Sequence, residues 1–138
     1  MLEEIQGAGS RGAAVELMQE ALANLARELY AGGRIDAALS IGGAEGAQLG
    51  AAFMHSLPVG VPKVIVSPAA SGRREFYPFV GASDVLGMHS VIDILGINAV
   101  SKAAFGNAAA AIAGMCRRGV GKPRGERPSL RNPMLGQT

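Results

Sequence analysis

Apolar residues recur at three- and four-residue steps in the stretch "SRGAAVELMQEALANLARELYAGG", residues 10–33. The apolar positions are Ala14, Val15, Met18, Ala21, Leu22, Leu25 and Leu29. This spacing places them on one face of an amphipathic α-helix. Ser10 is the expected N-cap and Gly32 the expected C′ residue, so the sequence predicts a helix with a defined start and end.

Three shorter apolar runs lack this period and predict buried β-strands. They are residues 36–41, "VPKVIVS" at 61–67 and "MHSVIDILG" at 88–96. The second run is β-branched and apolar on both faces, which is typical of a central parallel strand.

The segments between these runs predict how the strands are connected. A helix is expected after the first strand, ending near Ser56, and a long polar loop, "PAASGRREFYPFVGASD", after the second. A final helix is expected over residues 97–115, with Asn98 as its N-cap. The alternation predicts an α/β fold, a three-layer parallel sheet with flanking helices.

The final helix, "INAVSKAAFGNAAAAIAGM", has almost no polar face. A helix that is apolar all round is normally buried on more than one side. Three strands cannot easily supply that cover, so the sequence predicts a partner, either a homo-oligomer or a missing companion subdomain.

Charge divides the chain of 138 residues into two parts. Residues 117–138 hold six basic residues and one acidic residue, a charge of +5, which leaves −3 on residues 1–116. The basic segment lacks periodicity and is predicted to be a disordered tail. No aromatic residues interleave its charges, which argues against a nucleic-acid partner.

The remaining composition narrows the class of protein. A single cysteine excludes an internal disulfide, and two histidines do not favour a zinc centre, so no metal site is expected. The first residues do not resemble a signal peptide, and no uninterrupted apolar run reaches the roughly 20 residues of a membrane span. We therefore expect a cytoplasmic protein without a membrane partner.

Three predicted loops leave the carboxyl ends of the strands, where open parallel sheets bind ligands. They are residues 42–47, 67–72 and 93–98, and all three are rich in small residues. The first and third loops also open helices, whose unpaired N–H groups attract anions. Together the loops predict a nucleotide site.

Longer motifs resemble a known family. "SIGGAEGAQLGAAFMHSLPVGVPKVIVSPAASG", "FVGASDVLGMHSVIDILGIN" and "NAAAAIAGM" follow, in order and spacing, a family of uncharacterised bacterial proteins and plant proteins. The family includes the tomato tobamovirus-resistance protein, an inhibitor of viral RNA replication. The resemblance implies an ATP-binding N-terminal region of two Rossmann-like subdomains, and residues 1–116 resemble part of the first.

The resemblance also implies that the domain is truncated, because an opening β-α unit with an Asp-Thr-Lys-Gly motif and the second subdomain have no counterpart here. It implies a site that binds ATP, with or without Mg²⁺. The cofactor-binding residues expected on this basis are Gly42, Gly43, Glu45, Gly46, Ser67, Ser71, Gly72, Asp84, Asp93 and Asn98. Neither a catalytic residue nor a self-sufficient enzymatic activity is expected.

Two departures from the family pattern concern this site. The family's Gly-Gly-Ser-Gly-Gly-Thr turn is replaced by "GGAEGA", so two hydroxyls are missing and Glu45 replaces a glycine; Pro68 replaces a threonine. Glu45 could stabilise its own helix N-terminus, or hold a ribose hydroxyl or a phosphate-bound Mg²⁺. The alternative function is therefore an oligomeric or partner-binding fragment with a degraded nucleotide site.

Overall fold

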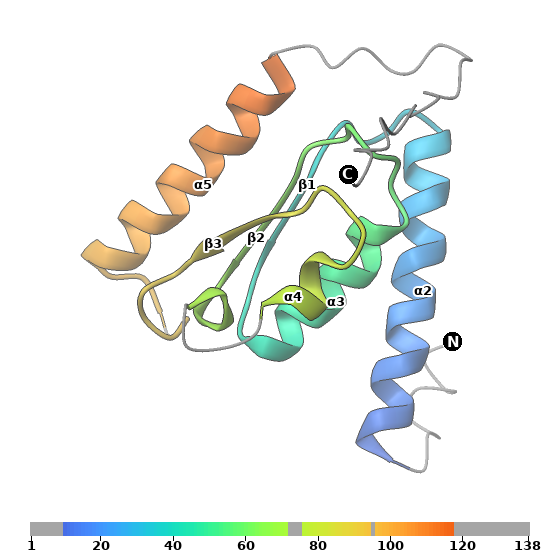
Figure 1. Ribbon diagram of the computed structural model, residues 1–138, viewed down its shortest axis with the longest axis horizontal. Coiled ribbons are helices and arrows are strands. Elements are labelled where there is room, and N and C mark those ends of the chain that lie inside the picture. Colours follow the sequence, from blue (N-terminus) through green and yellow to red (C-terminus); the bar gives the residue numbers. More distant parts are fainter. Residues whose placement is uncertain (1–9, 72–75, 95, 118–138) are drawn as a thin grey trace, which may run out of the picture.

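The computed structural model describes residues 10–71, 76–94 and 96–117. Three parallel strands form one sheet in the order β1-β2-β3 (Figure 1). Their bounds are Ala38–Ile41 for β1, Lys63–Ser67 for β2 and Leu86–His89 for β3. The predicted parallel α/β fold is therefore confirmed, with β2 as the central strand.

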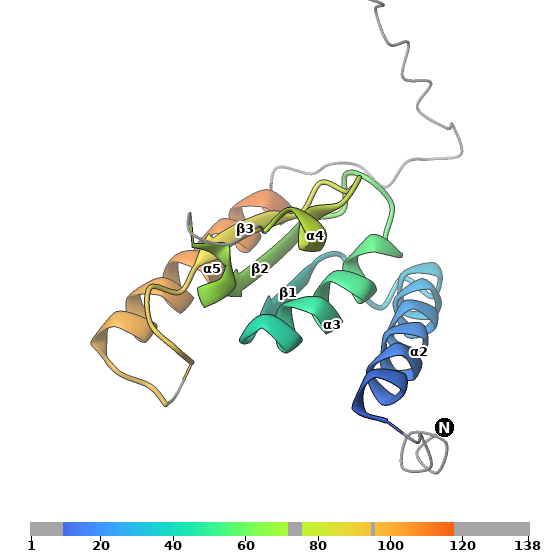
Figure 2. The same ribbon diagram turned by 60° about the horizontal axis from the view of Figure 1, so that its bottom comes forward.

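Helices cover both faces of this sheet, which gives the three layers that the sequence predicts. They are α2 (Arg11–Ala31), α3 (Ala44–His55), the 3-10 helix η1 (Pro68–Ala70), α4 (Tyr77–Val80) and α5 (Ala99–Arg117). Helices α3 and α4 lie on one side of the sheet with α2 packed beside α3, and α5 lies on the other side (Figure 2). Within the described part of the chain, none of the helices combines the length and apolarity needed to cross a membrane.

Helix α2 begins and ends close to the predicted residues. The Ser10 side chain accepts a hydrogen bond from the Ala13 N–H at 3.2 Å, which confirms its role as the N-cap. The C′ residue is Gly33 rather than the predicted Gly32, because Gly32 keeps helical angles and Gly33 adopts φ +64°. Gly33 is therefore the residue whose left-handed conformation ends the helix.

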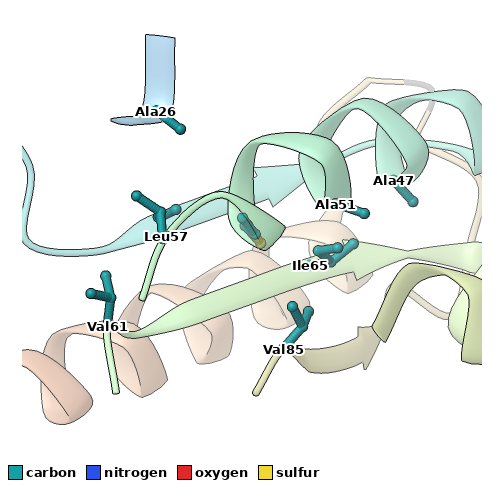
Figure 3. Packing of buried hydrophobic residues seen from close by; sticks show 9 residues of the cluster. Ala26, Ala47, Ala51, Leu57, Val61, Ile65 and Val85 are labelled. Carbon is teal, nitrogen blue, oxygen red and sulfur yellow. The ribbon is translucent and has the colours of Figure 1, made fainter. Parts of the chain in front are cut away.

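The larger hydrophobic cluster lies between α2, α3 and the sheet. Figure 3 shows Ala47 and Ala51 of α3 directed towards Ile65 of β2, with Leu57 and Val85 closing the amino end of the strands. Burying an isoleucine such as Ile65 contributes about 1.5–3 kcal/mol. The alanines allow α3 to approach the sheet closely, so few large side chains are needed.

The third strand and the preceding loop differ from the sequence prediction. The strand ends at His89 rather than 96, because the Ser90 hydroxyl donates to the Ile92 carbonyl at 2.7 Å and Val91 turns to φ +70°. The segment predicted as a continuous loop contains η1 and α4. Pro68 and Pro78 each occupy the start of one of these short helices, a position that suits proline.

Helix α5 is less covered than its sequence predicts. Only Ser101 and Ala108 are buried, and Ala108 packs with Val64 and Val66 of β2. The helix covers the central strand and leaves apolar residues of the outer strands about 40% exposed: Leu39 at 39%, Ile41 at 41% and Leu86 at 43%. The expected burial of α5 on more than one side is thus absent from the described structure.

Candidate functional site

The carboxyl ends of the three strands meet at one edge of the sheet, because all three strands are parallel. The loops that follow them are residues 42–43, the segment from 68 to 71 and residues 90–98, of which residue 95 is not described. The structure therefore brings together the three loops that the sequence analysis singled out.

Glycines form the first of these loops and open α3. Gly43 is the N-cap, and no side chain caps this helix. A β-carbon on Gly42 would lie 2.9 Å from the Gly46 Cα, so the strand-to-helix turn requires glycine at position 42. By contrast, no atom lies within 4 Å of a β-carbon added to Gly43 or Gly46. These two positions border open space that a ligand could occupy.

Glu45 lies in the first turn of α3 and is exposed. A carboxylate in this position interacts favourably with the helix dipole, by about 0.3–1 kcal/mol. The same negative charge opposes an incoming phosphate. Glu45 is therefore the negative charge that an anion approaching this turn would meet.

The serines of the second loop have different surroundings. Ser67 is 0% exposed, and its hydroxyl oxygen accepts a hydrogen bond from the Ala69 N–H at 3.2 Å, which starts η1. Ser71 ends η1 and is half-buried. Ser71 is thus the more accessible of the two predicted ligands, and Gly72 lies outside the described residues.

The third loop leads into α5, which is capped by its own sequence. The Asn98 side-chain oxygen accepts hydrogen bonds from the N–H groups of Val100 at 2.9 Å and Ser101 at 3.0 Å. The Ser101 hydroxyl accepts in return from the Asn98 N–H at 2.8 Å. Asn98 is therefore the N-cap that the sequence predicts, and its side-chain oxygen already has partners. Asp93 is exposed in the same loop.

Asp84 lies at the opposite, amino-terminal end of the sheet from the glycine turn. Its carboxylate accepts from the Lys63 ammonium at 2.6 Å and from the Gly60 N–H at 2.7 Å. The side chain of Lys63 is 0% exposed, and its ammonium also donates to the carbonyls of Pro58 and Val61. The length of β2, roughly 13 Å, separates these groups from the glycine turn.

The pKa of Asp84 reflects these contacts. Burial raises this pKa. The hydrogen bond and positive charge of Lys63, together with the hydrogen bond from the Gly60 N–H, outweigh burial and lower the pKa below 3.8. Asp84 is thus ionised at neutral pH and ties the turn before β3 to the loop before β2.

Sequence reasoning missed two contacts that shape this edge. The Ser40 hydroxyl donates to the Gly46 carbonyl at 3.3 Å, which fixes the first turn of α3 to β1. Gly50 lies against the same serine, since a β-carbon there would overlap Ser40. The Gly42, Gly46 and Gly50 spacing, one helical turn apart, was the available signal for this close packing.

These features define a Rossmann-like α/β domain with a glycine-lined helix N-terminus at the carboxyl edge of its sheet. Residues 2–120 match the model of an uncharacterised protein family, the UPF0261 N-terminal domain. The chain belongs to this family.

Individual relatives agree with this assignment. A UPF0261 protein of Clostridium tetani is 36% identical over 99% of this chain, and one of Mesorhizobium japonicum is 40% identical over 99%. The tomato ToMV resistance protein Tm-1(GCR237) is 42% identical over 82% of the chain. The chain spans only 33% of the length of each bacterial relative and 15% of the tomato protein.

Proposed function

We propose that this chain is a nucleotide-binding module that takes ATP at the N-terminus of α3. The observation that carries the proposal is the glycine turn, in which Gly43 caps the helix without a side chain and Gly43 and Gly46 face open space. Unpaired N–H groups at such a helix start attract phosphate. The accessible Ser71 and Asp93 belong to the neighbouring loops and are the additional contacts we propose.

The electrostatics of the turn predict weak binding. A carboxylate about 5 Å from a phosphate charge costs roughly 3 kcal/mol at an effective dielectric constant near 20. That energy corresponds to about a hundredfold in affinity. Glu45 therefore weakens the attraction of the helix N-terminus for phosphate, and a bound Mg²⁺ held between Glu45 and the phosphates would relieve the repulsion.

The test is a calorimetric titration of the wild-type chain and Glu45→Gln with ATP, with and without Mg²⁺. We expect weak binding by the wild type and up to about a hundredfold tighter binding of metal-free ATP by the variant, because the repulsion is removed. If Glu45 instead holds Mg²⁺, the variant loses the Mg²⁺ dependence of binding.

Glu20→Gln is the matched control, since Glu20 is an exposed residue of α2 outside the three loops. It removes the same charge and should leave ATP affinity unchanged. The proposal fails if neither the wild type nor Glu45→Gln gives heat or a thermal shift with millimolar ATP, ADP or GTP.

A second candidate function is partner binding without a working nucleotide site. It is favoured by the apolar face of the sheet, which α5 covers mainly over β2, leaving Leu39, Ile41 and Leu86 each about 40% exposed. Light scattering at micromolar concentration tests the oligomeric form of this function. A monomer would exclude a homo-oligomer and leave only a different partner.

A further inference from the structure

Val91, two residues after the end of β3, has a left-handed backbone conformation. Its φ is +70°, and no other non-glycine residue among residues 10–71, 76–94 and 96–117 has a positive φ. This region is uncommon for any residue with a β-carbon and a genuine outlier for a β-branched residue such as valine. It disfavours the residue by a factor of roughly 5–30 relative to a right-handed conformation. The turn after β3 is therefore strained.

Hydrogen bonds of Ser90, rather than packing of Val91, hold this turn in place. Ser90 is 1% exposed, and its hydroxyl donates across Val91 to the Ile92 carbonyl at 2.7 Å. The Ser90 N–H donates to the Ser67 carbonyl at 3.3 Å, which ties the turn to the end of β2. Val91 itself is 65% exposed, so its burial offsets little of the strain.

The path of the chain does not require a left-handed valine. The connection from β3 to α5 runs over residues 90–98 and contains Gly96, which adopts φ +80° without a steric cost. A connection of this length has room to turn at its glycine alone. Strained backbone conformations of this kind cluster at active sites and ligand clamps, where they hold a loop in one conformation. The strain at Val91 therefore points to a role in the third loop of the candidate site.

The turn changes the direction of this loop before the chain reaches Asp93. If Val91 and Ile92 continued β3, each residue would advance about 3.3 Å along the strand, and Asp93 would lie roughly 13 Å beyond His89. The left-handed residue interrupts this advance. The position of Asp93 relative to the sheet edge thus depends on the conformation of Val91.

We propose that Val91 is a positioning residue of the nucleotide site. Its left-handed conformation holds the third loop, with Asp93, in the conformation that binds ATP, at a cost to the stability of the fold. Val91 needs no contact of its own with the ligand in this role. Because the loop is ordered before ATP arrives, less conformational entropy is lost on binding. This inference rests on the function proposed above.

The test compares Val91→Gly with Val91→Ala, which differ only in the β-carbon. Glycine adopts positive φ readily, so the unfolding equilibrium constant from urea denaturation should be about fivefold smaller for Val91→Gly. Its ATP affinity in calorimetric titration should nevertheless be about tenfold weaker than that of Val91→Ala, since binding must then fix a freed backbone residue. A gain in stability together with a loss of affinity is not expected of a residue with a merely structural role.

Two further substitutions separate the strain from a general loosening of the loop. Ser90→Ala removes the hydrogen bond that closes the turn and should also weaken ATP binding, but with a loss of stability. Ile97 is 75% exposed in the same loop and has no positive φ, so Ile97→Gly should be less stable than Ile97→Ala. Because weak binding is expected of the wild type, each titration is repeated in the Glu45→Gln background.

Two results would overturn this inference and leave the nucleotide function intact. The first is an equal ATP affinity of Val91→Gly and Val91→Ala. The second is that Val91→Gly is no more stable than Val91→Ala, since Val91 would then not be strained. If neither the wild type nor Glu45→Gln binds ATP, the proposed function itself fails, and the role of Val91 fails with it.

Discussion

The polar groups at the two ends of β2 differ in charge and in the partners that satisfy them. At the amino end, Lys63 is buried with a carboxylate and two carbonyls as partners. At the carboxyl end, the polar groups are the buried Ser67 hydroxyl, which accepts from the Ala69 N–H, and the uncharged backbone groups of the glycine turn. The amino end thus stabilises the fold through side chains, whereas the carboxyl end keeps backbone groups near open space, as a ligand site requires.

The largest effect is expected from breaking the amino end. Lys63→Met keeps the length of the side chain but leaves the Pro58 and Val61 carbonyls and Asp84 without their ammonium. Because Asp84 is 38% exposed and can be solvated, we expect a loss near the lower limit for buried pairs, about 3 kcal/mol. Thermal unfolding should shift down by about 10 °C or more.

Lys102→Met is the control for this substitution, because Lys102 is exposed on α5. Its free energy of unfolding should change by less than about 0.5 kcal/mol. If Lys63→Met is as mild as Lys102→Met, the amino end does not stabilise the fold in the way described.

A smaller loss is expected at the carboxyl end from Gly42→Ala. The new β-carbon would lie 2.9 Å from the Gly46 Cα, and such overpacking costs about 1–3 kcal/mol. Gly46→Ala meets no atom within 4 Å and should stabilise α3 by about 0.5–1 kcal/mol. Urea denaturation of both variants checks the difference in sign, and a destabilised Gly46→Ala would contradict the open space at this position.

The cap of α5 is expected to contribute less still. Asn98→Ala removes the acceptor for the Val100 and Ser101 N–H groups and should cost about 1 kcal/mol. Asn107→Ala lies in the same helix on an exposed face and should be neutral or slightly stabilising. Equal stabilities for the two variants by thermal unfolding would show that the cap is not formed.

The smallest effect is a pH dependence at the amino end. Because the pKa of Asp84 is lowered in the folded state, its stabilisation is present above the unfolded value of 3.8 and is lost as the pH falls through the folded value. The difference in free energy of unfolding between the wild type and Asp84→Asn should therefore shrink below about pH 4. A difference that stays constant from pH 6 to about pH 3 would contradict the lowered pKa.

The sequence predicted the elements whose signals are local. Helix α2 begins at its predicted Ser10 cap and β2 follows its β-branched run, so both elements were correctly placed. The predicted apolar face of α2 was only partly correct, because Met18 and Leu25 are exposed and the buried residue is Ala26.

The predicted end of β3 was wrong. Val91 and Ile92 have strand-forming side chains, but the hydrogen bond from the Ser90 hydroxyl to the Ile92 carbonyl turns the chain. Propensity alone does not reveal such a side-chain contact.

The candidate site was predicted as a set of loops but not as a set of contacts. The glycine turn and the Asn98 cap could be predicted because strand ends and helix starts carry recognisable residues. The position of Asp84 could not be predicted, since its partner Lys63 is 21 residues away and the ion pair between them depends on how β2 and β3 align. Similarly, the close contact between Ser40 and Gly50 depends on the docking of α3 onto β1.

The strand order that places β2 in the centre also has a consequence for how the chain folds. Lys63 pairs with Ala38 across 25 residues, and Leu86 pairs with Val64 across 22 residues. Since the entropy of closing a loop grows only slowly with its length, the two closures cost nearly the same. Chain entropy therefore does not decide whether β1 or β3 docks first onto β2. The helices that connect these strands to β2 decide it. Helix α3, which packs against β1 and β2 alike, favours that half of the sheet.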